Sequence, residues 1–464
     1  MLNHRNDVYG QRATLRRTVR RCLTILLFLL IYDGAIRKWL VPDFEQLVFI
    51  AKDVLLAGLL VFVLLARSTK VPAVIPWFVR IPLGFYVCWV VIEAANPNLP
   101  NLLVGVWGSK SHLLYASFLL LLPCAFMRLD DVFRSLARCY PWVVVPACGL
   151  ALVQLTLPAT SFWNQQVRGG MAGIAYFGEF SLVRVAGPFS YISGMGSFVQ
   201  VSVLLGIALF IWGARSRPFL VGLGFALAAL PATGSRAVVL VVVAGGVMML
   251  FSGMQGRVTT TRMTVRAVCL LAVLVVFSLS VQDVAWQALI DRTVAARGDQ
   301  DRALTAFTNA FAHMNQAGLV GFGTGAANLG AVALASDVSP FSWLPLGATF
   351  EEESGRMVLE LGVIGWSLSL LMRGSMLLWA LDLLGRGANR TIRAAAVLVL
   401  PVTALAVYQG NGVFATPLAA AYFWFCIAML AMAQHEQNVL SIRRGSEKSG
   451  CDPRLKTALR VRYS

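Results

Sequence analysis

Long apolar segments recur along the whole chain, and each carries little or no charge. Each is long enough to cross about 30 Å of hydrocarbon as a helix. We count twelve, at residues 22–40, 45–66, 71–95, 110–127, 139–158, 190–213, 217–233, 236–252, 265–284, 356–380, 392–409 and 413–433. The pattern predicts an all-α fold, a polytopic integral membrane protein with about twelve transmembrane helices.

Two of these segments carry several polar or charged residues. The segment 22–40 contains Asp33, Arg37 and Lys38, and the segment 71–95 contains Arg80. The first is not predicted to be a cleavable signal peptide, because no small-residue cleavage site follows it and two cations stand where the apolar run should end.

Composition supports the membrane interpretation. Of 464 residues, 58% are hydrophobic and 13% are charged, with a mean hydropathy of +0.72. A soluble domain averages about 45–50% apolar and about 25% charged residues. These values argue against a soluble enzyme, a disordered chain, a collagen and a coiled coil.

The charge balance is strongly basic, with 39 Lys and Arg against 22 Asp and Glu and a net charge of +17. If the N-terminus is cytoplasmic, the cytoplasmic segments hold 26 of the 39 cations and the outer segments hold ten. This asymmetry follows the positive-inside rule and predicts that both termini are cytoplasmic. The charge is then a topology signal, so we expect the lipid bilayer, and not nucleic acid, as a partner.

Metal-binding and disulfide patterns are not found in the sequence. Seven of the eight cysteines lie in or beside the apolar segments, Cys451 lies in the C-terminal tail, and the four histidines are scattered. We therefore expect no metal site, no cofactor and no disulfide framework.

One connection is much longer than the others. The apolar pattern divides the chain into a basic tail (1–21), nine transmembrane helices (22–284), a large loop on the outer side (285–353), three further helices (354–433) and a basic tail (434–464). Apolar spacing predicts that the loop is partly helical, with helices at 291–297 and 301–316. Loops of this length are usually functional.

A glycine cluster follows the second loop helix. Gly321, Gly323 and Gly325 could bring backbone N–H groups close to a phosphate. The cluster matches neither the Rossmann nor the P-loop pattern. A tight turn that folds the loop back on the membrane explains the same residues.

Three arginines lie on the side that is depleted of basic residues: Arg184, Arg236 and Arg302. Guanidinium groups bind phosphate in a bidentate manner and stay charged at any relevant pH. If the three arginine side chains converge on one site, that site would suit a pyrophosphate ligand. Snorkelling at the interface or ion pairing with nearby carboxylates is the alternative explanation.

At these residues the chain resembles the O-antigen ligase / O-antigen polymerase (Wzy-like) superfamily of bacterial membrane glycosyltransferases. Four stretches carry the resemblance, over about 184–377: Arg184-Val185-Ala186-Gly187-Pro188-Phe189, Thr233-Gly234-Ser235-Arg236-Ala237, Arg302 with Gly321-Phe322-Gly323-Thr324-Gly325, and Glu353-Ser354-Gly355 with Leu359-Glu360-Leu361-Gly362. Ligases of the family carry a His-Asn pair where this chain has Glu353-Ser354, and acidic residues there resemble polymerase-like or less characterised branches of the superfamily.

The resemblance implies a GT-C-like fold and a site on the periplasmic face of the bacterial inner membrane. The donor would be a glycan on undecaprenyl pyrophosphate, and the acceptor a sugar hydroxyl on another lipid-linked glycan. Chain-length regulators or export proteins are further candidate partners.

The same resemblance suggests roles for individual residues. Arg236 and Arg302 are expected to stabilise the departing pyrophosphate, and Glu353, which follows two acidic neighbours, is the candidate general base. Substrate contacts are expected from Arg184, Gly321, Gly323, Gly325 and Arg356.

Two other functions remain open. Lys52 with Asp53, or Arg80 with Glu93, could line a polar pathway in a transporter or lipid-linked-oligosaccharide flippase. A non-catalytic assembly subunit would use the large loop to bind partners. The segment Tyr32–Trp39 also resembles a motif, and interfacial anchoring by Trp39 and two cations explains it.

Overall fold

The computed structural model describes residues 2–66, 72–165, 167, 176, 183–253, 299–328, 334, 353–409, 413–414 and 416–448. Within these residues the chain is helical and contains no strand. The elements are α1 (Leu2–Ala35), η1 (Ile36–Leu40), η2 (Pro42–Phe44), α2 (Glu45–Leu65), α3 (Trp77–Glu93), α4 (Leu102–Leu113), η3 (Leu114–Ser117), α5 (Phe118–Ala125), α6 (Leu129–Thr156), η4 (Phe162–Asn164), α7 (Ile192–Trp212), α8 (Arg217–Ala232), α9 (Arg236–Gly253), α12 (Asp299–Ala317), α14 (Glu353–Arg386), α15 (Arg390–Tyr408) and α16 (Pro417–Lys448).

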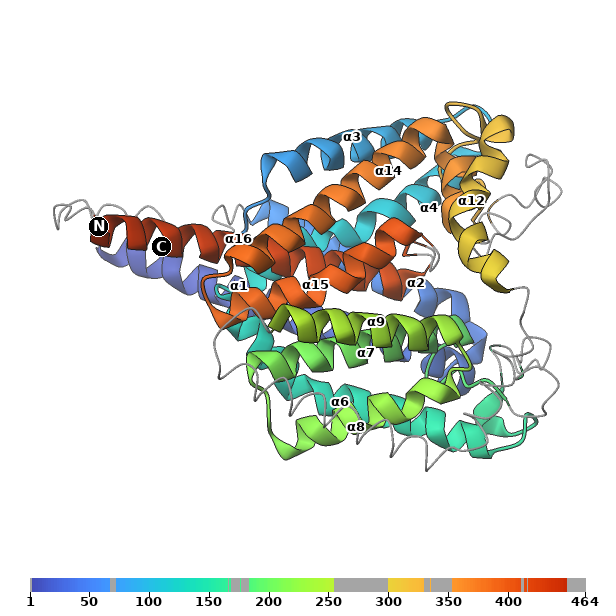
Figure 1. The fold of residues 1–464 in the computed structure, drawn as a ribbon, viewed down its shortest axis with the longest axis horizontal. Coiled ribbons are helices and arrows are strands. Elements are labelled where there is room, and N and C mark those ends of the chain that lie inside the picture. The colour runs from blue at the N-terminus through green and yellow to red at the C-terminus, as the bar shows by residue number, and fades with distance from the viewer. Residues whose placement is uncertain are drawn as a thin grey trace.

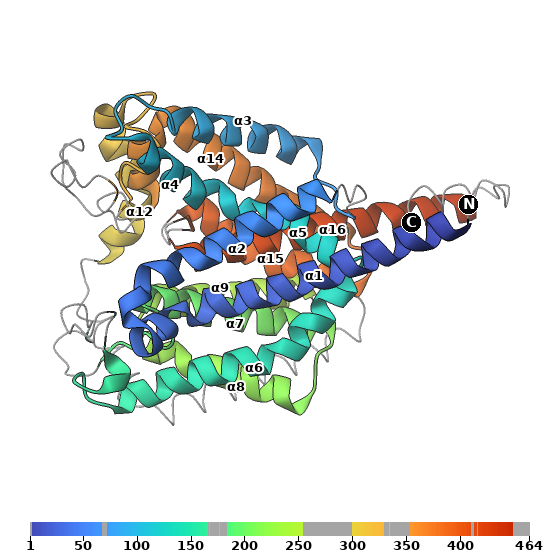
Figure 2. The ribbon, with the colours of Figure 1, turned by 180° about the vertical axis from the view of Figure 1, so that it is seen from behind.

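Most of these helices run side by side in one bundle around a continuous apolar core (Figures 1 and 2). Helix α12 is the exception, because it lies across the ends of the others and packs on α14. Six helical segments are long and apolar enough to cross a membrane, and they are Pro42–Leu65, Leu129–Thr156, Ile192–Trp212, Glu353–Arg386, Arg390–Tyr408 and Pro417–Arg444. The chain is therefore built as an all-helical membrane protein.

Apolar periodicity predicted the places of several helices well. Helices α2, α7, α8, α9 and α15 begin and end within about two residues of the predicted segments. The predicted loop helix at 301–316 is also confirmed, as α12. The predicted segment 265–284 and the predicted helix at 291–297 lie outside the described residues.

The predicted segment 110–127 is not one helix. It is divided into the end of α4, the 3-10 turn η3 and the short helix α5. Helix α4 begins earlier, at Leu102, because the Asn101 side chain accepts a hydrogen bond from the Val104 N–H and caps it. Its Gly108 lies against the backbone of Thr324 and Gly325, so the helix can approach the glycine segment closely.

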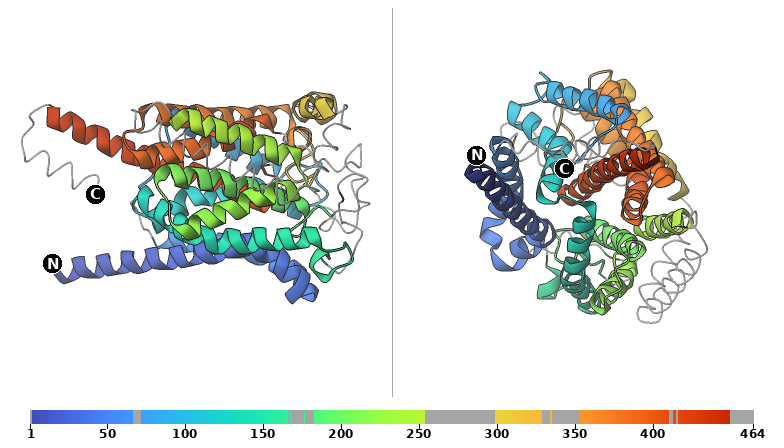
Figure 3. Two further views of the ribbon diagram at one scale, coloured as in Figure 1. Left: turned by 60° about the horizontal axis from the view of Figure 1, so that its bottom comes forward. Right: turned by 90° about the vertical axis from the view of Figure 1, so that its left-hand side faces the viewer.

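The first and last helices extend past the bundle. Helix α1 begins at Leu2, within the predicted basic tail, and α16 runs to Lys448, beyond the predicted end of the last span at 433. Figures 1 and 3 show that both project from the same end of the bundle, opposite α12.

Candidate functional site

Helix α14 is broken near its start and folds back on itself. Gly362 has φ +67° and ψ −176°, values that lie outside any helix. In a continuous helix, Glu353 and Arg373 would lie about 30 Å apart. Instead the Arg373 Nη2 atom is 2.8 Å from the Glu353 Oε1 atom. Residues 353–361 therefore fold back along 363–386 as a helical hairpin with Gly362 at its tip, and the predicted span at 356–380 is broken at this point.

This hairpin places Glu353 inside the bundle, where its side chain is buried. Its carboxylate accepts hydrogen bonds from both terminal nitrogens of Arg373, at 3.3 and 2.8 Å. It also accepts from the backbone N–H groups of Val413 at 2.8 Å and Phe414 at 3.1 Å. Arg373 Nη1 in turn donates to the Ala406 carbonyl at 2.7 Å. With both oxygens engaged, Glu353 has the geometry of an anchor, and its assignment as a general base stays a prediction.

A second set of buried polar side chains lies on residues 353–361, the shorter arm of the hairpin, and on the neighbouring helices α3 and α4. The Tyr86 hydroxyl is 2.8 Å from His112 Nδ1, and His112 Nε2 is 3.2 Å from a Glu360 oxygen. The His112 ring therefore bridges the Tyr86 hydroxyl and the Glu360 carboxylate through its two nitrogens. All three side chains are at most 1% exposed.

Arg356 completes this set and has unused hydrogen-bonding capacity. It is 6% exposed, and its Nε atom lies 3.9 Å from Glu360 Oε1, beyond hydrogen-bond reach. Its Nε and Nη2 atoms and the Glu360 Oε1 atom have no hydrogen-bond partner among the described residues. Buried unsatisfied groups of this kind are costly, so they mark a place for water or a polar ligand.

An aromatic ring joins the two sets of polar residues. The Phe414 ring centre lies 4.7 Å from the Arg373 guanidinium, 5.6 Å from the His112 ring and 6.5 Å from the Tyr86 ring. We call the six polar residues together the hairpin cluster: Tyr86, His112, Glu353, Arg356, Glu360 and Arg373.

The glycine cluster is hydrogen-bonded to the tip of the hairpin. The Phe322 N–H donates to the Leu359 carbonyl at 2.8 Å, and the Gly323 N–H donates to the Glu360 carbonyl at 3.0 Å. The Gly325 N–H donates to the Glu360 carboxylate. Gly321, Gly323 and Gly325 all have positive φ. Their N–H groups are therefore used inside the protein, and of the two explanations offered by the sequence the geometry favours the tight turn.

Arg184 lies beside the start of helix α9. Its Nε atom donates to the Thr233 carbonyl at 3.3 Å, and the neighbouring Val185 N–H donates to the Ala232 carbonyl at 3.4 Å. Arg236 begins α9 three residues after Thr233, and Arg302 lies in α12. The side chains of Arg236 and Arg302 are outside the described part of the structure.

Two further ion pairs connect α1, α2 and α4. Lys52 Nζ lies 2.6 Å from Asp33 Oδ2, and Lys110 Nζ lies 2.7 Å from Asp53 Oδ2. The Tyr115 hydroxyl also donates to Asp53, at 3.1 Å. Helix α4 therefore carries Lys110 toward α2 and His112 toward the hairpin cluster. We call these two contacts the interhelix ion pairs.

The sequence suggested other pairings for these charges. Lys52 and Asp53 are adjacent, but each pairs with a different helix. Arg80 donates to the Ile75 carbonyl and Glu93 accepts from Asn96, so the structure does not bring these two together. Among the described residues no group of three or more His, Cys, Asp or Glu side chains is placed to hold a metal ion.

Sequence reasoning missed most of the hairpin cluster. Tyr86 and His112 carry no motif, and periodicity does not show which helices meet. Glu360 and Arg373 did offer a signal, because each is an ionisable residue inside an apolar segment, where such residues are expensive and often functional.

Comparison with models of known protein families finds no family that matches this chain, and comparison with curated proteins finds no match.

Proposed function

We propose that this protein is a membrane glycosyltransferase that transfers or polymerises glycans carried on undecaprenyl pyrophosphate. The reaction would take place at the periplasmic face of the bacterial inner membrane, in a fold of about twelve spans with both termini in the cytoplasm. The donor would be the lipid-linked glycan, and the acceptor a hydroxyl group on a second glycan.

The observation that supports this proposal most is how the four resembling stretches pack. The first two stretches meet where the Arg184 side chain donates a hydrogen bond to the Thr233 carbonyl. Beside it, the Val185 N–H donates to the carbonyl of Ala232, the last residue of α8. The last two meet where Phe322 and Gly323 bond to Leu359 and Glu360. Stretches far apart in the sequence thus form two contacting pairs, as parts of common functional architecture would.

The chemistry requires a stabilised leaving group and a base. The acceptor oxygen forms a bond to the anomeric carbon, the bond to the lipid pyrophosphate breaks, and the acceptor proton passes to a base. Arginines can stabilise the charge that develops on the pyrophosphate without a metal. Arg184, Arg236 and Arg302 are the candidates for this role. Arg356 is a further one, because two of its buried nitrogens lack a partner among the described residues.

The test is turnover by the purified protein. In lipid nanodiscs with a lipid-linked glycan and no divalent metal, the wild-type protein should release lipid pyrophosphate and form a longer or transferred glycan. Arg184→Ala, Arg236→Ala and Arg302→Ala should each lower turnover by about 10²–10³-fold. Arg134→Ala is the matched control, because this exposed arginine only pairs with Asp130 within α6. Equal turnover in all variants, or strict dependence on a metal, would contradict the proposed mechanism.

A lipid-linked-oligosaccharide flippase is the second candidate, and the interhelix ion pairs favour it. Ionisable residues buried between membrane helices often mark a transport pathway. The two functions differ in where the precursor accumulates when the protein fails. Loss of a flippase traps the lipid-linked glycan on the cytoplasmic face, whereas loss of a transferase lets it accumulate on the outer face.

A further inference from the structure

The end of α1 has an unusual local structure. Residues Ile36–Leu40 form a π-helical turn, η1, and the 3-10 turn η2 then leads into α2. π-helical turns are rare and are frequent at functional sites. This one carries Arg37 and Lys38, two consecutive cations near the outer end of the bundle.

Lys38 is a buried cation without a counter-charge. Its side chain is 5% exposed, and among the described residues no carboxylate lies within 4 Å of it. The contact that the structure shows for its ammonium is the ring of Trp39, at 5.6 Å. An uncompensated buried charge costs several kcal/mol. The position is therefore suited to an anionic group that the described residues do not supply.

Arg37 also has spare donor capacity. Its Nη1 atom donates to the Ser190 hydroxyl at 3.1 Å, and its guanidinium lies 5.1 Å from the Phe49 ring centre. Its Nε atom is buried without a hydrogen-bond partner among the described residues. Arg37 and Lys38 thus add positive charge, and no carboxylate among the described residues forms an ion pair with either side chain.

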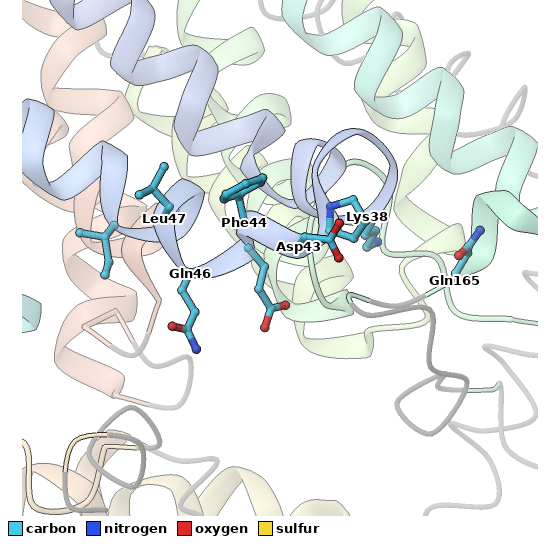
Figure 4. A pocket seen from close by; sticks show the side chains of 9 residues that line it. Lys38, Asp43, Phe44, Gln46, Leu47 and Gln165 are labelled. Atoms are coloured by element: carbon cyan, nitrogen blue, oxygen red, sulfur yellow. The ribbon is translucent and has the colours of Figure 1, made fainter.

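A pocket of about 980 Å³ opens beside this step. Figure 4 shows Lys38 and Asp43 toward the end of the pocket that is nearer Gln165, with Gln46 and Leu47 toward the other end. Glu45 adds a second carboxylate to the lining. Three apolar lining residues point outward, since Phe44 is 62%, Leu47 70% and Ile50 43% exposed. The pocket therefore combines the buried ammonium of Lys38, the more exposed carboxylates of Asp43 and Glu45, and an apolar wall that can contact hydrocarbon chains.

We propose that this pocket binds a phospholipid whose headgroup carries both a phosphate and a primary ammonium, as phosphatidylethanolamine does. The phosphate would lie on Lys38, the ammonium on Asp43, and the acyl chains along Leu47 and Ile50. A purely anionic headgroup would meet two carboxylates at the rim, and a quaternary ammonium has no N–H to donate to them.

Aromatic residues nearby favour a bilayer lipid over a water-soluble ligand. Trp39, Phe162 and Trp163 pack on one another beside the pocket, with ring centres 5.4 to 6.4 Å apart. Tryptophan gathers at the boundary between headgroups and hydrocarbon, which places the pocket at headgroup depth.

The test is lipid binding to the delipidated full-length protein in detergent, followed by native mass spectrometry, so the result is independent of the proposed transfer reaction. The probes are short-chain phosphatidylethanolamine, phosphatidylcholine and phosphatidylglycerol, with polyprenyl phosphate as a competitor. Phosphatidylethanolamine should bind about tenfold more tightly than the other two phospholipids. Equal binding of all three, tighter binding of phosphatidylglycerol, or displacement by polyprenyl phosphate at equal concentration would overturn the proposal.

Substitutions separate the two halves of the headgroup. Lys38→Gln should weaken the binding of all three phospholipids by about tenfold, whereas Lys38→Arg should retain their binding. Asp43→Asn should remove the preference for phosphatidylethanolamine over phosphatidylcholine and leave phosphate binding in place. The exposed Arg134→Gln is the control. If Lys38→Gln folds with unchanged thermal stability and binds as the wild type does, the assignment is wrong. If the Lys38→Gln protein fails to fold, the proposal stands or falls on whether Asp43→Asn removes the preference for phosphatidylethanolamine over phosphatidylcholine.

Discussion

Glu353 and Arg373 are twenty residues apart in the sequence, yet their side chains form a bidentate ion pair inside the bundle. The pair ties the two arms of the helical hairpin together. Ala406 ties the hairpin to the end of α15, and Val413 and Phe414 tie it to the connection that leads into α16. Both side chains are fully buried, so neither charge has water to compensate for a lost partner.

Removing one partner of this pair should therefore destabilise the protein strongly. Arg373→Ala and Glu353→Gln should each lower the free energy of unfolding by roughly 3–5 kcal/mol. The double variant Glu353→Gln, Arg373→Met should recover much of the loss, because no uncompensated charge remains. Thermal unfolding in detergent measures both effects. A Glu353→Gln protein with wild-type stability and no turnover would instead support the base assignment.

The tip of the hairpin should tolerate no side chain. At Gly362 φ is +67°, and an added Cβ would collide with the backbone of Leu319. Gly362→Ala should lower the free energy of unfolding by roughly 1–3 kcal/mol. Gly374→Ala is the matched control, since nothing lies within 4 Å of its Cβ position. There the change should be neutral or stabilise the helix by up to about 1 kcal/mol. Similar effects at the two glycines would contradict the hairpin.

The link between His112 and Glu360 should appear as a coupling energy. His112→Ala and Glu360→Gln should each cost roughly 1–3 kcal/mol of stability, and their effects should be less than additive by about 0.5–3 kcal/mol. A double-mutant cycle from chemical unfolding measures this. His313→Ala, on the exposed face of α12, should stay within about 0.5 kcal/mol. Additive effects would show that the two buried groups do not interact.

The interhelix ion pairs lead to a further expectation. Asp33→Asn leaves the 2%-exposed Lys52 without its carboxylate and should lower the free energy of unfolding by roughly 3–5 kcal/mol. Adding Lys52→Met to this variant should restore much of the lost free energy of unfolding, because no unpaired buried charge then remains. The comparison is Asp382→Asn, which breaks the exposed pair with Arg386 and should cost less than about 1 kcal/mol. A loss of similar size at both sites would mean that Lys52 is solvated.

Local pattern predicted the helices, because each membrane helix must satisfy its own backbone and present an apolar surface. Helices α2, α7, α8, α9 and α15 needed no tertiary information, and α12 followed from the spacing of Phe307, Phe311 and Met314. The break at Gly362 did not follow. A glycine in an apolar run has the same sequence signature whether it packs against a neighbour or reverses the chain.

The candidate site was harder to predict for a related reason. Arg184 and the segment Thr233–Ala237 were singled out separately, and the structure joins them through the bond from the Arg184 side chain to the Thr233 carbonyl. Glu353 was singled out from the sequence, but its ion pair with Arg373 was not predicted, because that pair forms only when the hairpin folds back. Partners such as His112 and Glu360 lie 248 residues apart, and no pattern within one helix indicates such a contact.

Helices α1 and α16 leave the bundle at one end, away from α12 (Figure 1). A polypeptide that starts and finishes on the same side of a bilayer crosses it an even number of times. Fluorescent or enzymatic reporters fused to the two ends would thus occupy one compartment, whichever way the protein is inserted.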